Sequence, residues 1–170
     1  MPEAEWTRYK LQRKLFAVGE DFWIENDKGE QVFKVDGKAL SIRKRFLLED
    51  QAGVELLSVE TKLIAIQPTM KIERQDGRLY ATVTKALFTL LHQHYTIQVE
   101  GGLTYETDGD ITNHEYEVRS NGETVAQISR QWFSIRDAYG VAIAPGLDQA
   151  LMLAAAVCID EISERQRERH

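Results

Sequence analysis

The sequence is poor in cysteine and proline. Of its 170 residues, one is cysteine, Cys158, and three are proline. A single cysteine excludes an intrachain disulfide and favours a reducing compartment, so we expect a cytoplasmic protein. The scarcity of proline and the lack of a Ser/Gly-rich tract leave no obvious linker, and we therefore expect one domain over residues 1–170.

Long hydrophobic runs are also missing. The longest, Ala150 to Ile159, has ten residues, whereas a transmembrane helix needs about 20. The first residues contain no apolar core of the kind found in signal peptides, and nothing suggests lipidation. We therefore expect a protein that is not integral to a membrane.

Charge is unevenly distributed along the chain. The net charge is −6, which argues against general affinity for nucleic acid. Residues 1–45 carry ten Lys/Arg and eight Asp/Glu, a net of +2, while residues 46–170 carry eleven and nineteen, a net of −8. An anion-binding surface is therefore expected near the N-terminus.

Glycine-containing turns recur with a spacing of about 24 residues along residues 6–144. Glycine suits tight hairpin turns, which need a positive φ. The flanking segments alternate apolar and polar residues, as half-buried strands do. Ten to twelve antiparallel strands are therefore predicted, and so many strands either split into a sandwich or close into a barrel. The turn glycines are Gly29, Gly53, Gly77, Gly101 and Gly122.

The C-terminal region differs from the rest and is predicted to form a helix over residues 147–164. Asp148 suits a helix start, and the ten apolar residues from Ala150 cover every face of a helix. Such a helix is enclosed, and its alanines keep it slim enough for a small barrel. The fold class is therefore mainly β, with antiparallel strands that could close as a barrel around this helix. Its expected core residues are Leu151, Met152, Leu153, Val157, Ile159 and Ile162.

Motifs of one known family are spread over nearly the whole chain. They are Tyr9 to Phe16, Asp21 to Ile24 with Gly29, Val32 to Lys38, Lys62–Leu63, Pro68 to Met70, His114 to Val118, Trp132 to Val141 and the terminal helix. A β-meander with these motifs, followed by one wholly apolar helix, resembles the Tubby C-terminal-like superfamily. Within it, the sequence is most similar to the LURP-one-related group of small bacterial and plant proteins.

The resemblance implies a twelve-stranded barrel threaded by the terminal helix. Other proteins of this fold include phosphoinositide-binding Tubby domains and phospholipid scramblases. No Tubby lipid-binding motif is matched, and the Pro-rich N-terminal region, acylated cysteine cluster and calcium loop of scramblases are missing. The resemblance therefore implies a fold without a defined activity, and we expect no cofactor.

Basic residues near the N-terminus form a candidate binding site for anionic headgroups. Along residues 8–15, Arg8, Lys10, Gln12 and Lys14 alternate with Tyr9, Leu11, Arg13 and Leu15. A strand here would therefore present a basic stripe outward. A second basic cluster is Arg43, Lys44 and Arg45. Near an anionic membrane such residues contribute about 1 kcal/mol each. The alternative interpretation is a solvated face that protects an edge strand.

His92-Gln93-His94 is the sharpest local pattern. On a strand the two imidazoles would share one face, as metal ligands can. The pair loosely resembles cupin ligands, but the glutamate expected four or five residues later is missing. The alternative is that both are surface histidines. No Walker loop, dinucleotide fingerprint, nucleophile elbow or zinc-type cysteine pair is present, so no catalytic residue is assigned.

Two functional hypotheses follow. The leading one is a non-enzymatic cytoplasmic binding or scaffold domain that recognises phospholipid headgroups or a protein partner, but not nucleic acid. The alternative is a metal-dependent enzyme or metal-binding protein that uses His92 and His94. An exposed basic patch would favour the first, and convergence of the histidines with further ligands would favour the second.

Overall fold

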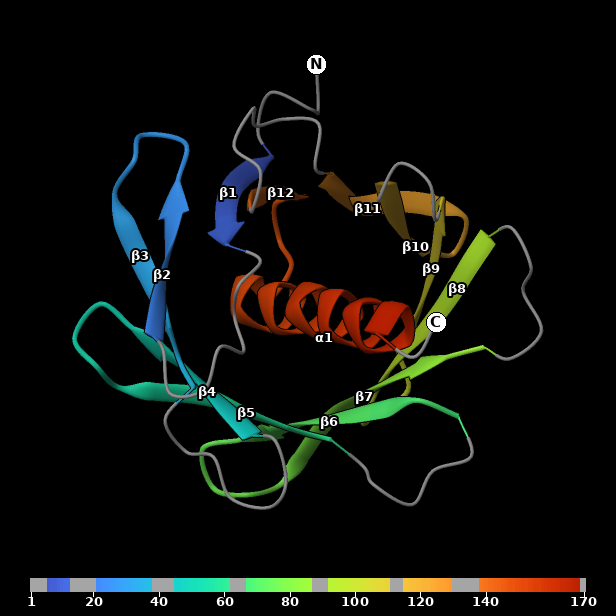
Figure 1. Cartoon of the computed structure of the whole chain (residues 1–170), viewed down its shortest axis with the longest axis horizontal. Helices are drawn as coiled ribbons and strands as arrows, with labels where there is room; N and C mark the ends of the chain where they lie inside the picture. Colours follow the sequence, from blue (N-terminus) through green and yellow to red (C-terminus); the bar gives the residue numbers. More distant parts are fainter. Residues whose placement is uncertain are drawn as a thin grey trace.

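The computed structural model confirms the predicted fold class. Within the residues that it describes, twelve antiparallel strands form a closed barrel and one helix runs through its interior (Figure 1). These residues are 6–12, 21–37, 45–61, 67–86, 92–110, 115–129 and 138–168. The strands are β1 (Thr7–Gln12), β2 (Asp21–Asn26), β3 (Gln31–Asp36), β4 (Arg45–Asp50), β5 (Glu55–Thr61), β6 (Thr69–Arg74), β7 (Leu79–Lys85), β8 (His92–Val99), β9 (Thr104–Asp110), β10 (Glu115–Ser120), β11 (Glu123–Ser129) and β12 (Ala138–Ile143); the helix α1 is Gln149–Glu168.

The barrel is a meander in which each strand pairs with its neighbours in sequence. The circle closes where β1 pairs with β12, in a register that runs from Thr7 opposite Ile143 to Gln12 opposite Ala138. Closure pairs every strand on both sides, and it therefore removes the exposed edges that would otherwise promote aggregation.

Tight turns join alternate strands as the glycine spacing predicted. In the β6–β7 turn Gly77 has a φ of +87°, and in the β10–β11 turn Asn121 and Gly122 have φ values of +52° and +84°. Two successive residues with positive φ are typical of type I′ hairpin turns. The carboxylate of Asp50 supports the β4–β5 turn, since it accepts hydrogen bonds from the backbone N–H groups of Ala52 and Val54.

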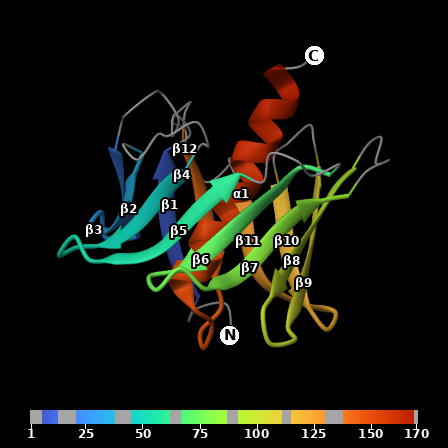
Figure 2. The same ribbon diagram turned by 90° about the horizontal axis from the view of Figure 1, so that it is seen from below.

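The two ends of the barrel differ. Because antiparallel strands alternate in direction, the short hairpin turns and the β12–α1 connection lie at the same end, which we call the hairpin end (Figure 2). The helix begins there and ends at the opposite side (Figure 2). We define the hairpin end as residues 26–30, 50–54, 74–78, 99–103, 120–123 and 144–148. These ranges hold the connections and six strand ends: Asn26, Asp50, Arg74, Val99, Ser120 and Glu123.

The interior of the barrel is filled by α1. Every residue from Leu151 to Ile159 is buried, so no face of this part of the helix reaches solvent. All six residues expected in the helix core are buried. Ala154, Ala155 and Ala156 are at most 1% exposed, and their small side chains leave room for the surrounding strands. Within the described ranges, no helix has the length and hydropathy of a membrane span.

A buried polar cluster holds the second half of α1 in place. Its centre is the side-chain carbonyl oxygen of Gln93, Oε1, on β8. This atom accepts hydrogen bonds from the Tyr95 hydroxyl at 2.9 Å, the Tyr116 hydroxyl at 2.8 Å and Ser163 Oγ at 3.1 Å. Because Ser163 belongs to the helix and the other residues belong to strands, the cluster fixes how the helix is rotated inside the barrel.

Candidate binding surface at the hairpin end

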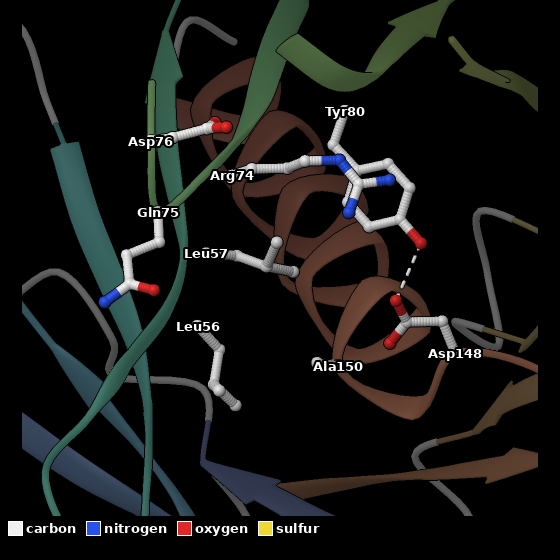
Figure 3. Close-up of a pocket in the computed structure, with 8 residues that line it drawn as sticks. All are labelled: Leu56, Leu57, Arg74, Gln75, Asp76, Tyr80, Asp148 and Ala150. Carbon is white, nitrogen blue, oxygen red and sulfur yellow. Dashed lines mark hydrogen bonds between the residues drawn. The ribbon is translucent and has the colours of Figure 1, made fainter. Parts of the chain in front are cut away.

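Two pockets open beside the start of α1. The first, which we call the Tyr80 pocket, has a volume of about 370 Å³, and the second, the Tyr9 pocket, has about 330 Å³. The Tyr80 pocket is lined by Leu56, Leu57, Arg74, Gln75, Asp76, Tyr80, Asp148 and Ala150 (Figure 3). The Tyr9 pocket is lined by Arg8, Tyr9, Lys10, Glu25, Asn26, Asp27 and Gly29.

Asp148 organises the Tyr80 pocket. One of its oxygens, Oδ2, accepts a hydrogen bond from the Tyr80 hydroxyl at 2.7 Å (Figure 3). The other, Oδ1, accepts one from the backbone N–H of Leu151 at 3.2 Å, which is the geometry of a helix N-cap. The same carboxylate therefore caps α1 and fixes the orientation of Tyr80 on β7.

The Tyr80 ring also supports the Arg74 side chain. The guanidinium carbon of Arg74 lies 3.8 Å from the ring centroid, a distance typical of a cation–π contact (Figure 3). Burial, together with the hydrogen bond and charge of Asp148, raises the pKa of Tyr80 to about 12, although Arg74 acts in the opposite direction. At neutral pH Tyr80 is therefore a neutral hydrogen-bond donor.

The Tyr80 pocket has an apolar floor and exposed apolar neighbours. Leu56, Leu57 and Ala150 line the floor. On the adjoining β4–β5 and β8–β9 turns, Val54 is 47% exposed and Leu103 is 56% exposed. Both turns flank the β6–β7 turn, because β5 pairs with β6 and β7 pairs with β8. Exposed apolar side chains thus lie on the turns at both sides of the β6–β7 turn, whose own residues 74–78 are polar or glycine.

The Tyr9 pocket contains part of the basic stripe expected on β1. Arg8 is exposed and Lys10 is half-buried, while Tyr9 between them points inward and its hydroxyl donates to Gln149 Oε1 at 2.9 Å. Lys10 lies opposite Glu25 in the strand register, and Asp27 lines the same pocket. The two cations therefore share their surroundings with two carboxylates.

The other expected headgroup-binding residues do not join this pocket in the described part of the chain. Arg45 begins β4 at the end of the barrel opposite the hairpin end, and its side chain is outside the described residues. Lys14, Arg43 and Lys44 also lie outside the described residues. The structure thus brings together Arg8 and Lys10 of the six.

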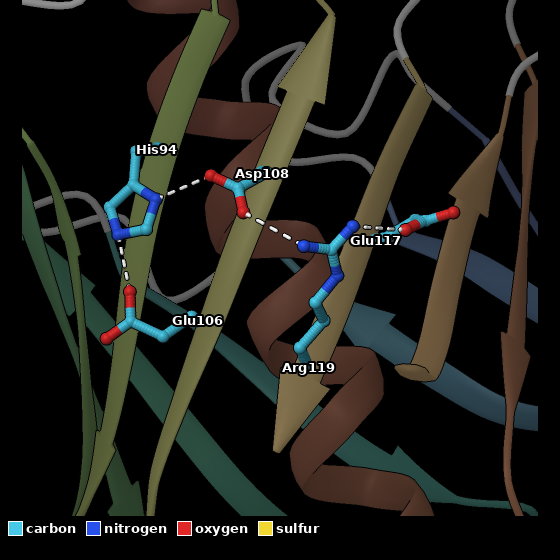
Figure 4. A network of polar contacts seen from close by, with 5 residues as sticks. All are labelled: His94, Glu106, Asp108, Glu117 and Arg119. Atoms are coloured by element: carbon cyan, nitrogen blue, oxygen red, sulfur yellow. Dashed lines mark hydrogen bonds and ion pairs between the residues drawn. The ribbon is translucent and has the colours of Figure 1, made fainter. Parts of the chain in front are cut away.

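His94 takes part in a polar network on the outer surface of β8, β9 and β10 (Figure 4). Its Nδ1 lies 2.7 Å from Asp108 Oδ1 and its Nε2 lies 2.5 Å from Glu106 Oε2. Arg119 extends the network, with Nη1 3.8 Å from Asp108 Oδ2 and Nη2 2.9 Å from Glu117 Oε2. Both ring nitrogens of His94 are therefore engaged by carboxylates.

The charge of His94 follows from these neighbours. Burial alone would lower its pKa, but the hydrogen bonds and negative charges of Asp108 and Glu106 together raise the pKa of His94 above its usual value. The side chain of His92 lies outside the described residues, and so does His114. Among the residues that the structure describes, no three His, Cys, Asp or Glu side chains are grouped so that they could hold a metal ion.

Cys158 lies in the middle of the enclosed helix. Its side chain is fully buried, and burial raises the pKa of the thiol. A thiol that stays protonated and shielded from solvent is a poor nucleophile. Its environment is thus that of a core residue.

Sequence reasoning missed the importance of Arg74 and Tyr80. The Asp76-Gly77 turn between them was recognisable, but the two side chains are six positions apart and meet because the hairpin folds back. Asp148 was recognisable as a helix cap. Its second role, as the acceptor for Tyr80, depends on the placement of the helix inside the barrel, for which the sequence holds no local signal.

Comparison with known proteins identifies the fold family. The sequence model of a family described as LURP-one-related matches residues 7–160. The structure is similar to the X-ray structure of a protein from Arabidopsis thaliana, with a TM-score of 0.67, 17% sequence identity, and coverage of 92% of this chain and 91% of that chain. At this identity the likeness shows a shared fold. A search of the curated proteins gave no significant match.

Proposed function

The chain belongs to the LURP-one-related family, and we propose that it is a non-enzymatic binding domain that docks a partner protein on the hairpin end of its barrel. The proposal takes residues 1–170 as one domain and the cytoplasm as its location, in keeping with the single cysteine. Because α1 fills the described interior, a partner has to be met on the outer surface.

The observation that carries the proposal is the apolar surface around the Tyr80 pocket. Val54 and Leu103 are the large hydrophobic side chains that the described part of the chain leaves exposed, and both lie on turns beside this pocket. Exposed apolar side chains next to a concave site are typical of protein interaction surfaces. Tyrosine and arginine, here Tyr80 and Arg74, are the residue types enriched in interface hot spots.

The pocket is also held in shape before any partner arrives. The Tyr80 hydroxyl is fixed by Asp148, and the Arg74 side chain is supported by the Tyr80 ring. The backbone N–H of Glu100 donates to the Tyr80 carbonyl at 2.9 Å, which joins the β8–β9 turn to β7. A preorganised surface loses less conformational entropy when it binds, so more of the contact energy contributes to affinity.

A selection experiment tests this proposal. Random peptides displayed on phage are selected for binding to the full chain, and enriched peptides are then measured against two variants. The rim variant carries Val54→Ser and Leu103→Ser, and the control variant carries Lys71→Ser and Gln98→Ser on the outer wall of the barrel. We expect the rim variant to bind about tenfold more weakly, a loss of about 1.4 kcal/mol.

The control variant should bind as the unmodified chain does. Bound peptides should slow hydrogen exchange at residues 50–54 and 99–103. If enriched peptides bind both variants equally and protect another surface, or if no peptide is enriched, the hairpin end is not the docking surface.

A second candidate is recognition of anionic phospholipid headgroups. Arg8 is exposed on β1, and the first 45 residues carry a net charge of +2. Under this hypothesis the chain co-sediments with phosphatidylserine liposomes at low salt, where the attraction is strongest, and charge reversal abolishes this binding. The variant replaces six basic residues with Glu: Arg8, Lys10, Lys14, Arg43, Lys44 and Arg45. If the unmodified chain ignores such liposomes, the lipid hypothesis is wrong.

A further inference from the structure

The hairpin end is strongly acidic. The six ranges that define it carry seven Asp/Glu and three Lys/Arg, a net charge of −4, compared with −6 for the whole chain. The acidic residues are Asp27, Glu30, Asp50, Asp76, Glu100, Glu123 and Asp148; the basic ones are Lys28, Arg74 and Arg78. Most of the excess negative charge is therefore concentrated on the surface that contains the pockets.

Two of the three cations are engaged within the surface itself. Arg78 Nε lies 3.1 Å from Asp76 Oδ2, and the Arg74 guanidinium lies over the Tyr80 ring. By contrast, Glu100 and Glu123 are exposed and make no ion pair with any described residue. The hairpin end thus keeps exposed negative charge for an incoming partner, from Glu100 on the turn beside the β6–β7 turn and from Glu123 one turn further round the barrel.

Charge and apolar contact occur on the same turn. Glu100 and Leu103 both belong to the β8–β9 turn, and Leu103 is 56% exposed. This turn is joined to Tyr80 by the hydrogen bond from the Glu100 N–H. The Tyr80 pocket, at about 370 Å³, is at the small end of the range of about 300–1,000 Å³ for ligand pockets. Its floor of Leu56, Leu57 and Ala150 suits one large apolar side chain.

From this combination we infer that the Tyr80 pocket receives an apolar anchor side chain from a basic segment of the partner protein. The inference rests on the proposed function and adds the chemistry of the partner. Lys and Arg on either side of the anchor would face Glu100 and its acidic neighbours, which speeds association and selects against acidic partners. The same charge would repel nucleic acid and anionic lipid from this end.

The inference is tested on the peptides that the phage selection yields. We expect these peptides to carry Lys and Arg around a Leu, Phe or Trp. Their affinity should fall about tenfold as salt rises from about 50 to about 300 mM. Synthetic versions in which Glu replaces Lys and Arg, or in which Ser replaces the anchor, should each bind about tenfold more weakly. Fluorescence anisotropy with the full chain measures all of these affinities.

Matched variants of the chain complete the test. One variant reverses charge by Glu100→Lys with Glu123→Lys. It should bind the basic peptides about tenfold more weakly and the Glu-substituted peptides more tightly. The control variant, Lys71→Ser with Gln98→Ser, should bind both kinds of peptide as the unmodified chain does. Suppose that the selected peptides are acidic or neutral, bind equally at low and high salt, and no longer bind the rim variant. The inference is then wrong while the proposed function stands. If no peptide depends on the rim residues, both are wrong.

Discussion

The ring of Tyr116 lies directly over Gly109, its partner on the neighbouring strand. A Cβ atom at position 109 would be 1.9 Å from Tyr116 Cδ1 and 2.1 Å from Cε1. Because glycine has no side chain, the Tyr116 ring can lean across β9 toward Gln93. Gln93 pairs with Gly109 from the strand on the other side, β8. The glycine therefore allows the Tyr116 hydroxyl to reach Gln93 Oε1 at 2.8 Å.

We expect Gly109→Ala to destabilise the barrel. The added methyl group would push the Tyr116 ring away and separate its hydroxyl from the buried Gln93 and Ser163. Overpacking and the loss of buried hydrogen bonds together cost about 2–4 kcal/mol. Urea denaturation of the variant and of the unmodified chain measures the difference in the free energy of unfolding.

A second background shows whether the Tyr116 ring is the cause. In a chain that already carries Tyr116→Ala, the methyl group of Gly109→Ala meets no ring, and the additional cost should fall below about 1 kcal/mol. Equal costs in both backgrounds would show that Gly109 is needed for another reason.

The network around His94 predicts a pH-dependent contribution to stability. Asp108 and Glu106 raise the pKa of His94 in the folded chain above the value of about 6.5 expected in the unfolded chain. A raised pKa stabilises the folded state fully below pH 6.5 or so, and this contribution disappears as the pH rises through the folded pKa.

The measurement compares the unmodified chain with His94→Gln. The difference between their thermal unfolding temperatures should be largest near pH 6 and should shrink toward pH 9. A difference that stays constant over this range would contradict the role of the His94 charge. The metal content of the same two samples is also measured. Stoichiometric metal in the unmodified chain that is missing from His94→Gln would support the metal-binding alternative for His92 and His94.

Substitutions separate the two roles of Asp148, as the N-cap of α1 and as the acceptor for Tyr80. Asparagine is as good an N-cap as aspartate, so Asp148→Asn should change the free energy of unfolding by less than about 0.5 kcal/mol, whereas Asp148→Ala should cost about 1–2 kcal/mol. Both variants remove the charge next to the Tyr80 hydroxyl. The Tyr80 pKa should therefore fall from about 12 toward its ordinary value.

An NMR titration of the Tyr80 ring measures this pKa directly. Burial also raises the pKa of Tyr80, so the value should remain above that of an exposed tyrosine, which is about 10. An unchanged Tyr80 pKa in Asp148→Asn would mean that the hydrogen bond to Asp148 does not control the pocket.

The features that the sequence predicts well are those with a local cause. Positive φ at Gly77 and Gly122 is a property of a few consecutive residues, and so is the alternation of apolar and polar residues on either side. The enclosed helix was predictable because an unbroken apolar run leaves no polar face for solvent. Closure into a barrel follows from these features only with the help of the family resemblance.

The features that escape prediction arise from contacts between distant strands. In His92-Gln93-His94 the histidines attract attention, yet Gln93 between them points inward and joins the buried polar cluster. The position of Lys10 opposite Glu25 depends on the β1–β2 register, which the sequence does not state. Likewise Gly109 looks like an ordinary flexible residue until Tyr116 is placed over it.

The enclosed helix gives the most demanding prediction about folding. Ala154 is 0% exposed and Ala155 is 1% exposed, and the two side chains lie on different faces of α1. A carboxylate at either position would be buried without a partner, which costs far more than a hydrogen bond supplies. We therefore expect Ala154→Asp and Ala155→Asp each to lower the free energy of unfolding by more than about 4 kcal/mol.

Ala150→Asp serves as the matched control. Ala150 lies in the first turn of the same helix and is half-buried beside the Tyr80 pocket. A carboxylate there can reach solvent and is favoured by the positive end of the helix dipole, so the change should stay within about 1 kcal/mol. Thermal unfolding of the three variants decides whether α1 is enclosed or lies on the surface. On a surface helix, either Ala154→Asp or Ala155→Asp would lower the stability only slightly.

Truncation before Leu147 extends the same test to the whole helix. Without α1, the inward-facing side chains of the strands, such as Ile72, Val83 and Ile97, would line an empty apolar lumen. Because full burial of each such side chain stabilises the fold by about 1.5–3 kcal/mol, the strands should not remain folded, and the truncated chain should be insoluble. A soluble truncation that unfolds cooperatively near the temperature of the full chain would show that the barrel is stable without its helix.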